Sequence, residues 1–99
     1  MIRWVWDPRT ARTNLRDHKV SFELAQPVFG DAEIISRPDR YPNEGRWQST
    51  GRPSPQSEVV LLAVHTESDP GPDGVETGRI ISARKATRHE RAAYEDRRF

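Results

Sequence analysis

The chain has 99 residues, a formal net charge of +1 and no cysteine, so a single domain, 1–99, is expected and disulfide or thiolate chemistry is excluded. Hydrophobic residues make up 33% of the chain and the mean hydropathy is −0.90, which indicates a small core. We find no signal peptide and no apolar run approaching the roughly 18 residues of a membrane span, and therefore expect a soluble, cytoplasmic protein. Arginine supplies 14 of the 16 basic residues, and its planar guanidinium suits phosphate.

The N-terminal segment predicts a strand followed by a helix. Residues 2–6 alternate in the manner of a half-buried strand, with Trp4 and Trp6 on the inner face. Asp7 is a favourable N-cap, and Pro8 suits the first helical position because its missing N–H costs nothing there.

Helical spacing predicts two faces for this first helix. The residues expected to face the core are Ala11, Leu15 and His18. A basic stripe on the outer face consists of Arg9, Arg12 and Arg16.

A second helix is expected after Ser21, which is placed to cap it, with Phe22, Ala25 and Phe29 facing inward. Pro27 interrupts this pattern, and we expect a kink or an early end there.

The rest of the chain predicts a sheet and a last helix. The expected strands are 33–36, 46–50, 59–66 and 79–83, the third central and paired with the fourth. Between these two, 66–78 contains four carboxylates and no basic residue, and we predict a long, mobile hairpin loop. Without it, the remaining body is clearly basic.

A strand-to-helix junction near the C-terminus predicts an anion site. Thr87 and Glu90 have capping-box spacing, so a helix should start at Thr87 and run to about residue 96. Arg84 and Lys85 directly precede this start, where unpaired N–H groups favour anions such as phosphate.

Several of these segments resemble the BrnT family, the toxins of bacterial type II toxin–antitoxin modules. The matching residues are Trp6-Asp7-Pro8, Asn14, His18, Val20-Ser21-Phe22-Glu23, Ala25, Phe29, Asp31, Glu44, Arg46, Gly51, the run from Arg79 to Thr87, Glu90, Arg91 and Tyr94. The acidic loop at 68–77 is longer than is usual in the family, and Lys19 occupies a turn position often held by Gly.

The resemblance implies an α+β, RelE-like microbial ribonuclease fold, with two N-terminal helices and a C-terminal helix packed on an antiparallel sheet. It implies an endoribonuclease that cleaves mRNA and inhibits translation. It also implies neutralisation by a BrnA-type antitoxin, in a heteromeric complex that binds operator DNA through the antitoxin. The alternatives are a non-catalytic RNA- or protein-binding module and a scaffold whose basic face recruits an acidic antitoxin tail.

Metal-independent RNA cleavage requires a base for the 2′-hydroxyl and cations for the phosphate. Glu44 and Arg46, two apart on an expected strand, could converge as base and cation, and their alternative is a surface ion pair. Arg79 and Arg84 are the other candidate catalytic cations, although five positions on a straight strand would turn them to opposite faces.

Further residues are candidates for RNA binding, each with a structural alternative. The candidates are Lys85, His18, Arg12, Arg16 and Tyr94. His18 also suits a core or capping role, and Tyr94 suits a docking role for the last helix. The general base could be Glu44, His18 or His65. The histidines lack metal-site spacing, so we expect neither a metal nor a cofactor.

Overall fold

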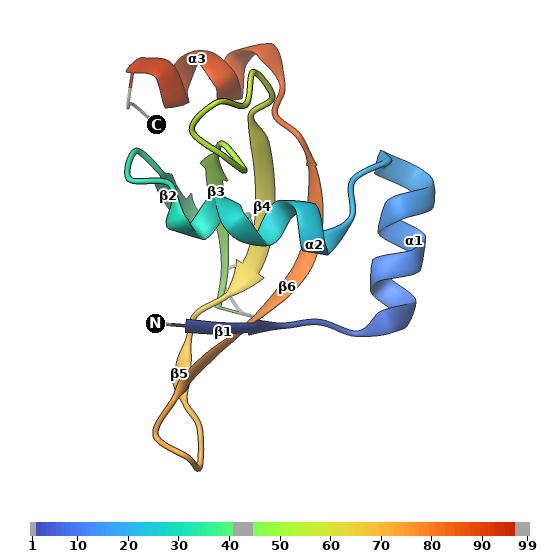
Figure 1. The fold of residues 1–99 in the computed structure, drawn as a ribbon, viewed down its shortest axis with the longest axis vertical. Coiled ribbons are helices and arrows are strands. Elements are labelled where there is room, and N and C mark those ends of the chain that lie inside the picture. Colours follow the sequence, from blue (N-terminus) through green and yellow to red (C-terminus); the bar gives the residue numbers. More distant parts are fainter. Residues whose placement is uncertain (1, 41–44, 97–99) are drawn as a thin grey trace.

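The computed structural model describes residues 2–40 and 45–96. Its elements are β1 (Ile2–Val5), α1 (Pro8–His18), α2 (Phe22–Ala25), the 3-10 helix η1 (Gln26–Gly30), β2 (Ile35–Pro38), β3 (Arg46–Gly51), β4 (Leu61–Thr66), β5 (Asp69–Pro70), β6 (Glu76–Lys85) and α3 (Arg88–Asp96). The fold is therefore α+β, as the sequence predicts (Figure 1).

The strands form one mixed sheet in the order β1-β6-β4-β3-β2. The prediction that β4 is central and pairs with β6 is confirmed. The expectation of an antiparallel sheet is wrong at one edge, because β1 runs parallel to β6, with Ile2 opposite Glu76 and Val5 opposite Arg79. A parallel partner requires a long crossover, which α1, α2 and the intervening strands provide.

The acidic segment that leads into β6 is a hairpin that extends from the body, as the sequence predicts, and its base contains the short strand β5 (Asp69–Pro70) (Figure 1). β5 pairs with the start of β6, and the backbone N–H of Gly71 donates to the carbonyl of Val75. Gly74 takes a φ of +79°, which glycine adopts without strain. Asp73 at the tip forms an exposed ion pair with Arg3, 3.1 Å between Nη2 and Oδ2.

The core lies between the sheet and the α2–η1 segment. Phe22, Ala25 and Val28 are fully buried against Leu61 and other strand residues. The α-helix ends at Ala25 and continues as η1, so the early end predicted at Pro27 is confirmed. Phe29 is only partly buried.

The predicted inward face of α1 is confirmed for Ala11, which packs against the core, and wrong for the other two residues. Leu15 and His18 are exposed, and the buried residue of this helix is Asn14. The polar residue faces inward because α1 packs beside the part of β6 that β1 does not cover, whose backbone groups require hydrogen bonds rather than apolar contact. The capping roles of Asp7 and Pro8 are confirmed, since the Asp7 carboxylate accepts from the N–H of Arg9 at 2.8 Å.

α3 is attached by polar contacts and by the buried side chain of Tyr94. The capping box is present: the N–H of Glu90 donates to the Thr87 hydroxyl, and the N–H of Thr87 to the Glu90 carboxylate. One turn later, the buried Tyr94 donates its hydroxyl to Asp31 at 2.6 Å. Burial and this bond raise the pKa of Tyr94 to about 12. Among the described helices, none is long and apolar enough to cross a membrane.

Candidate functional site

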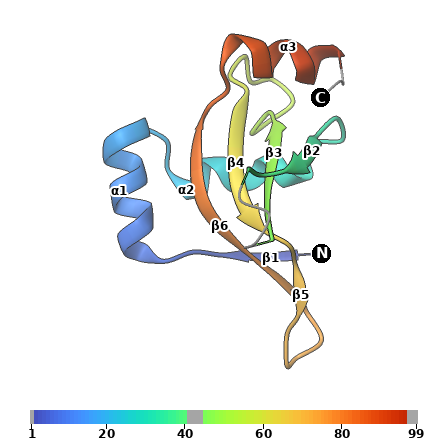
Figure 2. The same ribbon diagram turned by 180° about the vertical axis from the view of Figure 1, so that it is seen from behind.

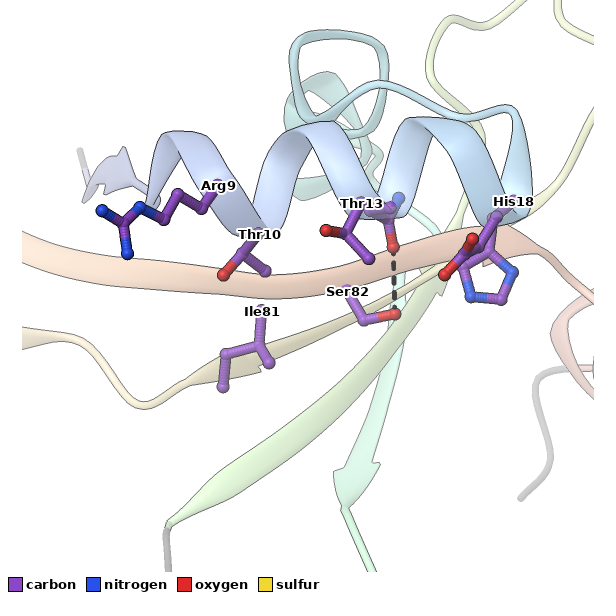
Figure 3. A pocket seen from close by; sticks show the side chains of 8 residues that line it. Arg9, Thr10, Thr13, His18, Ile81 and Ser82 are labelled. Carbon is purple, nitrogen blue, oxygen red and sulfur yellow. Dashed lines mark hydrogen bonds between the residues drawn. The ribbon is translucent and has the colours of Figure 1, made fainter.

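A groove runs between α1 and β6 (Figure 3). We call it the α1–β6 groove, and its lining residues are Arg9, Thr10, Thr13, Asn14, Asp17, His18, Ile81 and Ser82. Figure 3 shows Arg9 and His18 at opposite ends of the helix, with Thr10 and Thr13 between them and Ser82 below. Arg9 and His18 are nine positions apart, which corresponds to about 13 Å along the helix axis. The groove is thus long enough for more than one phosphate group.

Asn14 fixes the geometry of this groove. Its Nδ2 donates to the carbonyls of Val20 and Ala83 at 2.9 and 2.8 Å, and its Oδ1 accepts from the N–H of Ala83 at 3.1 Å. The Ser82 hydroxyl also donates to Oδ1, at 3.3 Å. The side-chain amide therefore takes the place of a neighbouring strand where β1 no longer pairs with β6.

The groove combines the groups that RNA chemistry requires. Arg9 supplies a guanidinium, and His18 supplies an exposed imidazole, the side chain that most often serves as a general acid or base. Hydroxyls of Thr10 and Thr13 can donate hydrogen bonds to phosphate or sugar oxygens, and the Ser82 oxygen can accept one.

The groove borders the sheet face that points away from α2, which we call the open face (Figure 2). Strand alternation places on it Arg37, Arg46, Gln48, Val64, Thr66, Ser82 and Arg84, all partly exposed. Ser82 belongs to both surfaces, so the groove and the open face are continuous.

Two of the predicted cations lie at the same end of this sheet. Arg46 is opposite Thr66 in the β3–β4 pair, and the N–H of Arg79 donates to the Thr66 hydroxyl at 3.0 Å. Arg79 is exposed and lines a hollow together with Val5, Gly45, Thr66, Glu67, Asp69, Thr77 and Gly78. The structure thus brings Arg46 and Arg79 to one end of the sheet, separated by one strand.

Arg84 lies far from this pair, since five strand residues span about 16 Å. Its guanidinium donates to both carboxylate oxygens of Glu90, at 2.7 and 2.9 Å, and that carboxylate also accepts from the N–H of Thr87. Glu90 therefore occupies the position at the helix start where the sequence predicts an external anion. The bond to Arg84, opposed by burial and assisted by Thr87, lowers the pKa of Glu90 to about 2.

The other candidate residues are dispersed. Lys85, Arg12 and Arg16 are exposed and do not line the groove, and Arg16 pairs with Asp17 at 3.0 Å. Tyr94 is 2% exposed, in its docking role. Glu44 lies outside the described residues. Among those that are described, no group of three or more His, Asp or Glu side chains could hold a metal ion.

His65 is buried on the other face of the sheet. Its Nδ1 lies 2.8 Å from the carbonyl of Thr66, which can only accept, so Nδ1 carries the proton and Nε2 accepts from Ser49 at 2.6 Å. Burial lowers the pKa of His65. Both ring nitrogens are therefore engaged within the fold.

Comparison with known proteins identifies the family. Residues 6–90 match the family described as the ribonuclease toxin BrnT of type II toxin–antitoxin systems. The chain belongs to the BrnT family. The fold is similar to the crystal structure of the Brucella abortus ribonuclease toxin BrnT, with a TM-score of 0.62 and 18% identity over 89% of this chain and 100% of that one. The search of curated proteins finds no match.

Proposed function

We propose that this BrnT-family protein is an endoribonuclease toxin that binds and cleaves RNA along the α1–β6 groove. The family match is the observation that carries the proposal for activity. The groove supports the proposed location of the active site, because Arg9, His18 and three hydroxyl side chains line this one accessible groove.

The proposed reaction needs no metal. His18 removes the proton of a ribose 2′-hydroxyl, the 2′-oxygen attacks the adjacent phosphorus, and the P–O5′ bond breaks. The 5′-oxygen then receives a proton from water, and His18 returns its proton to the solvent. The products are a 2′,3′-cyclic phosphate and a 5′-hydroxyl. Thr13 donates a hydrogen bond to the reacting phosphate, while Arg9, about 13 Å from His18 along the helix, binds a neighbouring phosphate.

Arg46 and Arg79 would bind flanking phosphates at the far end of the open face. Arg84 would contribute to the stability of the fold rather than bind RNA, since its guanidinium is paired with Glu90. Glu44 as the base stays an alternative prediction, whereas the engaged nitrogens of His65 argue against that residue.

In the cell, the proposed substrate is mRNA in the cytoplasm, and its cleavage inhibits translation. A BrnA-type antitoxin would neutralise the toxin and carry the complex to operator DNA. We further propose that the α+β arrangement is of the RelE-like type.

Controlled induction tests this function. Wild-type protein should arrest growth and deplete intact mRNA, whereas His18→Ala should do neither while accumulating as folded protein. Normal growth and intact mRNA in cells containing folded wild-type protein would contradict the proposal, and RNA binding without cleavage would indicate a non-catalytic module.

A further inference from the structure

An apolar surface lies on the opposite side of the sheet from the open face. It comprises two adjoining hollows that share Ile2, Trp4 and Phe29. The second hollow, of about 420 Å³, continues across the sheet over Ile34 and Trp47. We call these joined hollows the aromatic surface.

The aromatic surface remains partly exposed although its residues are large and apolar. Ile2, Trp4, Phe29, Ile34 and Trp47 all retain contact with solvent. A joined apolar area of this kind on a small domain commonly marks a binding site for another protein.

The rings are held in fixed positions before any partner binds. Trp4 stacks on Phe29 with centroids 3.8 Å apart and planes inclined by 16°, and His65 meets both edge-on. Trp47 is fixed through its Nε1, which donates to Glu67 at 3.0 Å. Little side-chain entropy would be lost on binding.

The charge at the rim distinguishes between classes of partner. Among the described residues that line the two hollows, the charged ones are Glu23 and Glu67, both exposed carboxylates. His65 stays neutral at pH 7 because burial lowers its pKa. Carboxylates repel an RNA backbone and attract Lys or Arg. The α1–β6 groove and most of the open face lie on the other side of the sheet, and the two sides meet at Thr66 and Glu67. The two sides are therefore suited to different partners.

We propose that the aromatic surface is the docking site for the antitoxin, and that it takes an antitoxin segment with apolar side chains flanked by Lys or Arg. This inference rests on the proposed function for the existence of an antitoxin, but it places that partner away from the RNA-binding side. A toxin bound in this way would present its groove to RNA unless another part of the antitoxin covers it.

The test measures affinity for the protein encoded by the neighbouring reading frame, co-expressed and then titrated against purified toxin variants. Trp47→Ala, Glu23→Lys and Glu67→Lys should each weaken the complex at least about tenfold, or about 1.4 kcal/mol. The matched control is Glu58→Lys, which reverses an exposed carboxylate that lines neither hollow and should change affinity less than about twofold. The two exposed charge reversals keep the test valid even if Trp47→Ala impairs folding.

Each other outcome overturns the inference. Unchanged affinity in all three variants would exclude the aromatic surface as the docking site. A loss of affinity only on substituting Arg9 or Arg79 would place the antitoxin on the side of the groove and the open face. Loss of RNA cleavage with retained antitoxin binding would make the aromatic surface an RNA site, and a changed toxin oligomer would make it a self-association surface. Absence of binding by wild-type toxin would show that the neighbouring reading frame does not encode a partner for this surface. RNA cleavage by the wild type, assayed separately, shows whether the proposed function itself stands.

Discussion

The side chain of Asn14 hydrogen-bonds to both backbone groups of Ala83, which is 69 residues further along the chain. β1 pairs with β6 only as far as Arg79, so the N–H and carbonyl of Ala83 would otherwise lack a strand partner. By satisfying both, one amide attaches α1 to the sheet and sets the width of the α1–β6 groove.

Asn14→Ala should therefore be strongly destabilising. It leaves the buried backbone groups of Ala83 and the carbonyl of Val20 without partners, and we expect the free energy of unfolding to fall by about 3 kcal/mol. Urea unfolding measures the change. Leu15→Ala, an exposed position on the same helix, should remain within about 0.5 kcal/mol of the wild type. Equal, small effects at both positions would show that the amide does not hold α1.

Gly78→Ala tests the packing of the parallel strand pair. A Cβ at Gly78 would clash with Cζ3 of Trp4, whose ring is already stacked on Phe29. Since the ring cannot move freely, we expect a loss of about 2 kcal/mol or more in thermal or urea unfolding. Gly30→Ala is the control, because nothing lies within 4 Å of its added Cβ. A neutral Gly78→Ala would contradict the close contact with Trp4.

Glu90 should make stability depend on pH at the acidic end. Its pKa is about 2 in the folded state against 4.5 for the unperturbed group, so its contribution is complete above about pH 4.5 and is lost as the pH falls toward 2. The full shift corresponds to about 3 kcal/mol. Glu90→Gln should lower the free energy of unfolding at pH 6 and approach the wild-type value near pH 2. A constant difference between the two proteins across this range would exclude an ionised, paired Glu90.

Arg84 and Arg79 should differ in what their removal affects. Arg84→Ala leaves a buried carboxylate unpaired and should reduce stability by about 2 kcal/mol, with the RNA affinity of the folded protein little changed. Arg79→Ala should leave stability within about 0.5 kcal/mol and weaken RNA binding about fivefold, with a smaller salt dependence. Arg88→Ala, at an exposed position on α3, is the control. RNA affinity that falls with Arg84 and not with Arg79 would reverse these roles.

Local signals in the sequence predict most of the elements. Asp7-Pro8, Ser21, Pro27 and the Thr87–Glu90 spacing predict helix boundaries correctly, because each acts within a few residues. The caps make local hydrogen bonds, and Pro27 lacks the N–H that would continue the α-helix. Alternation likewise predicts the strands to within a few residues. The parallel pairing of β1 with β6 was not predictable in this way, because it depends on contacts more than 70 residues apart.

The candidate site is harder to predict for the same reason. Apolar spacing on α1 favours Leu15 and His18 as core residues. The part of β6 beyond its pairing with β1 requires an amide, so Asn14 faces inward and His18 faces solvent. No local sequence pattern indicates that Thr13 lines the groove or that Ser82 hydrogen-bonds to Asn14. Arg84 and Glu90 are each recognisable, yet their bidentate pairing depends on how the strand turns into α3.

The most direct test of a ribonuclease site in the α1–β6 groove is the cleavage rate of a labelled RNA by purified protein in the presence of EDTA. Wild-type protein should produce 2′,3′-cyclic phosphate ends and leave a 2′-deoxy analogue intact. His18→Ala should be slower by about a hundredfold or more, whereas His89→Ala, at an exposed position on α3, should match the wild type. Cleavage by His18→Ala at the wild-type rate would contradict the assignment of the site to this groove.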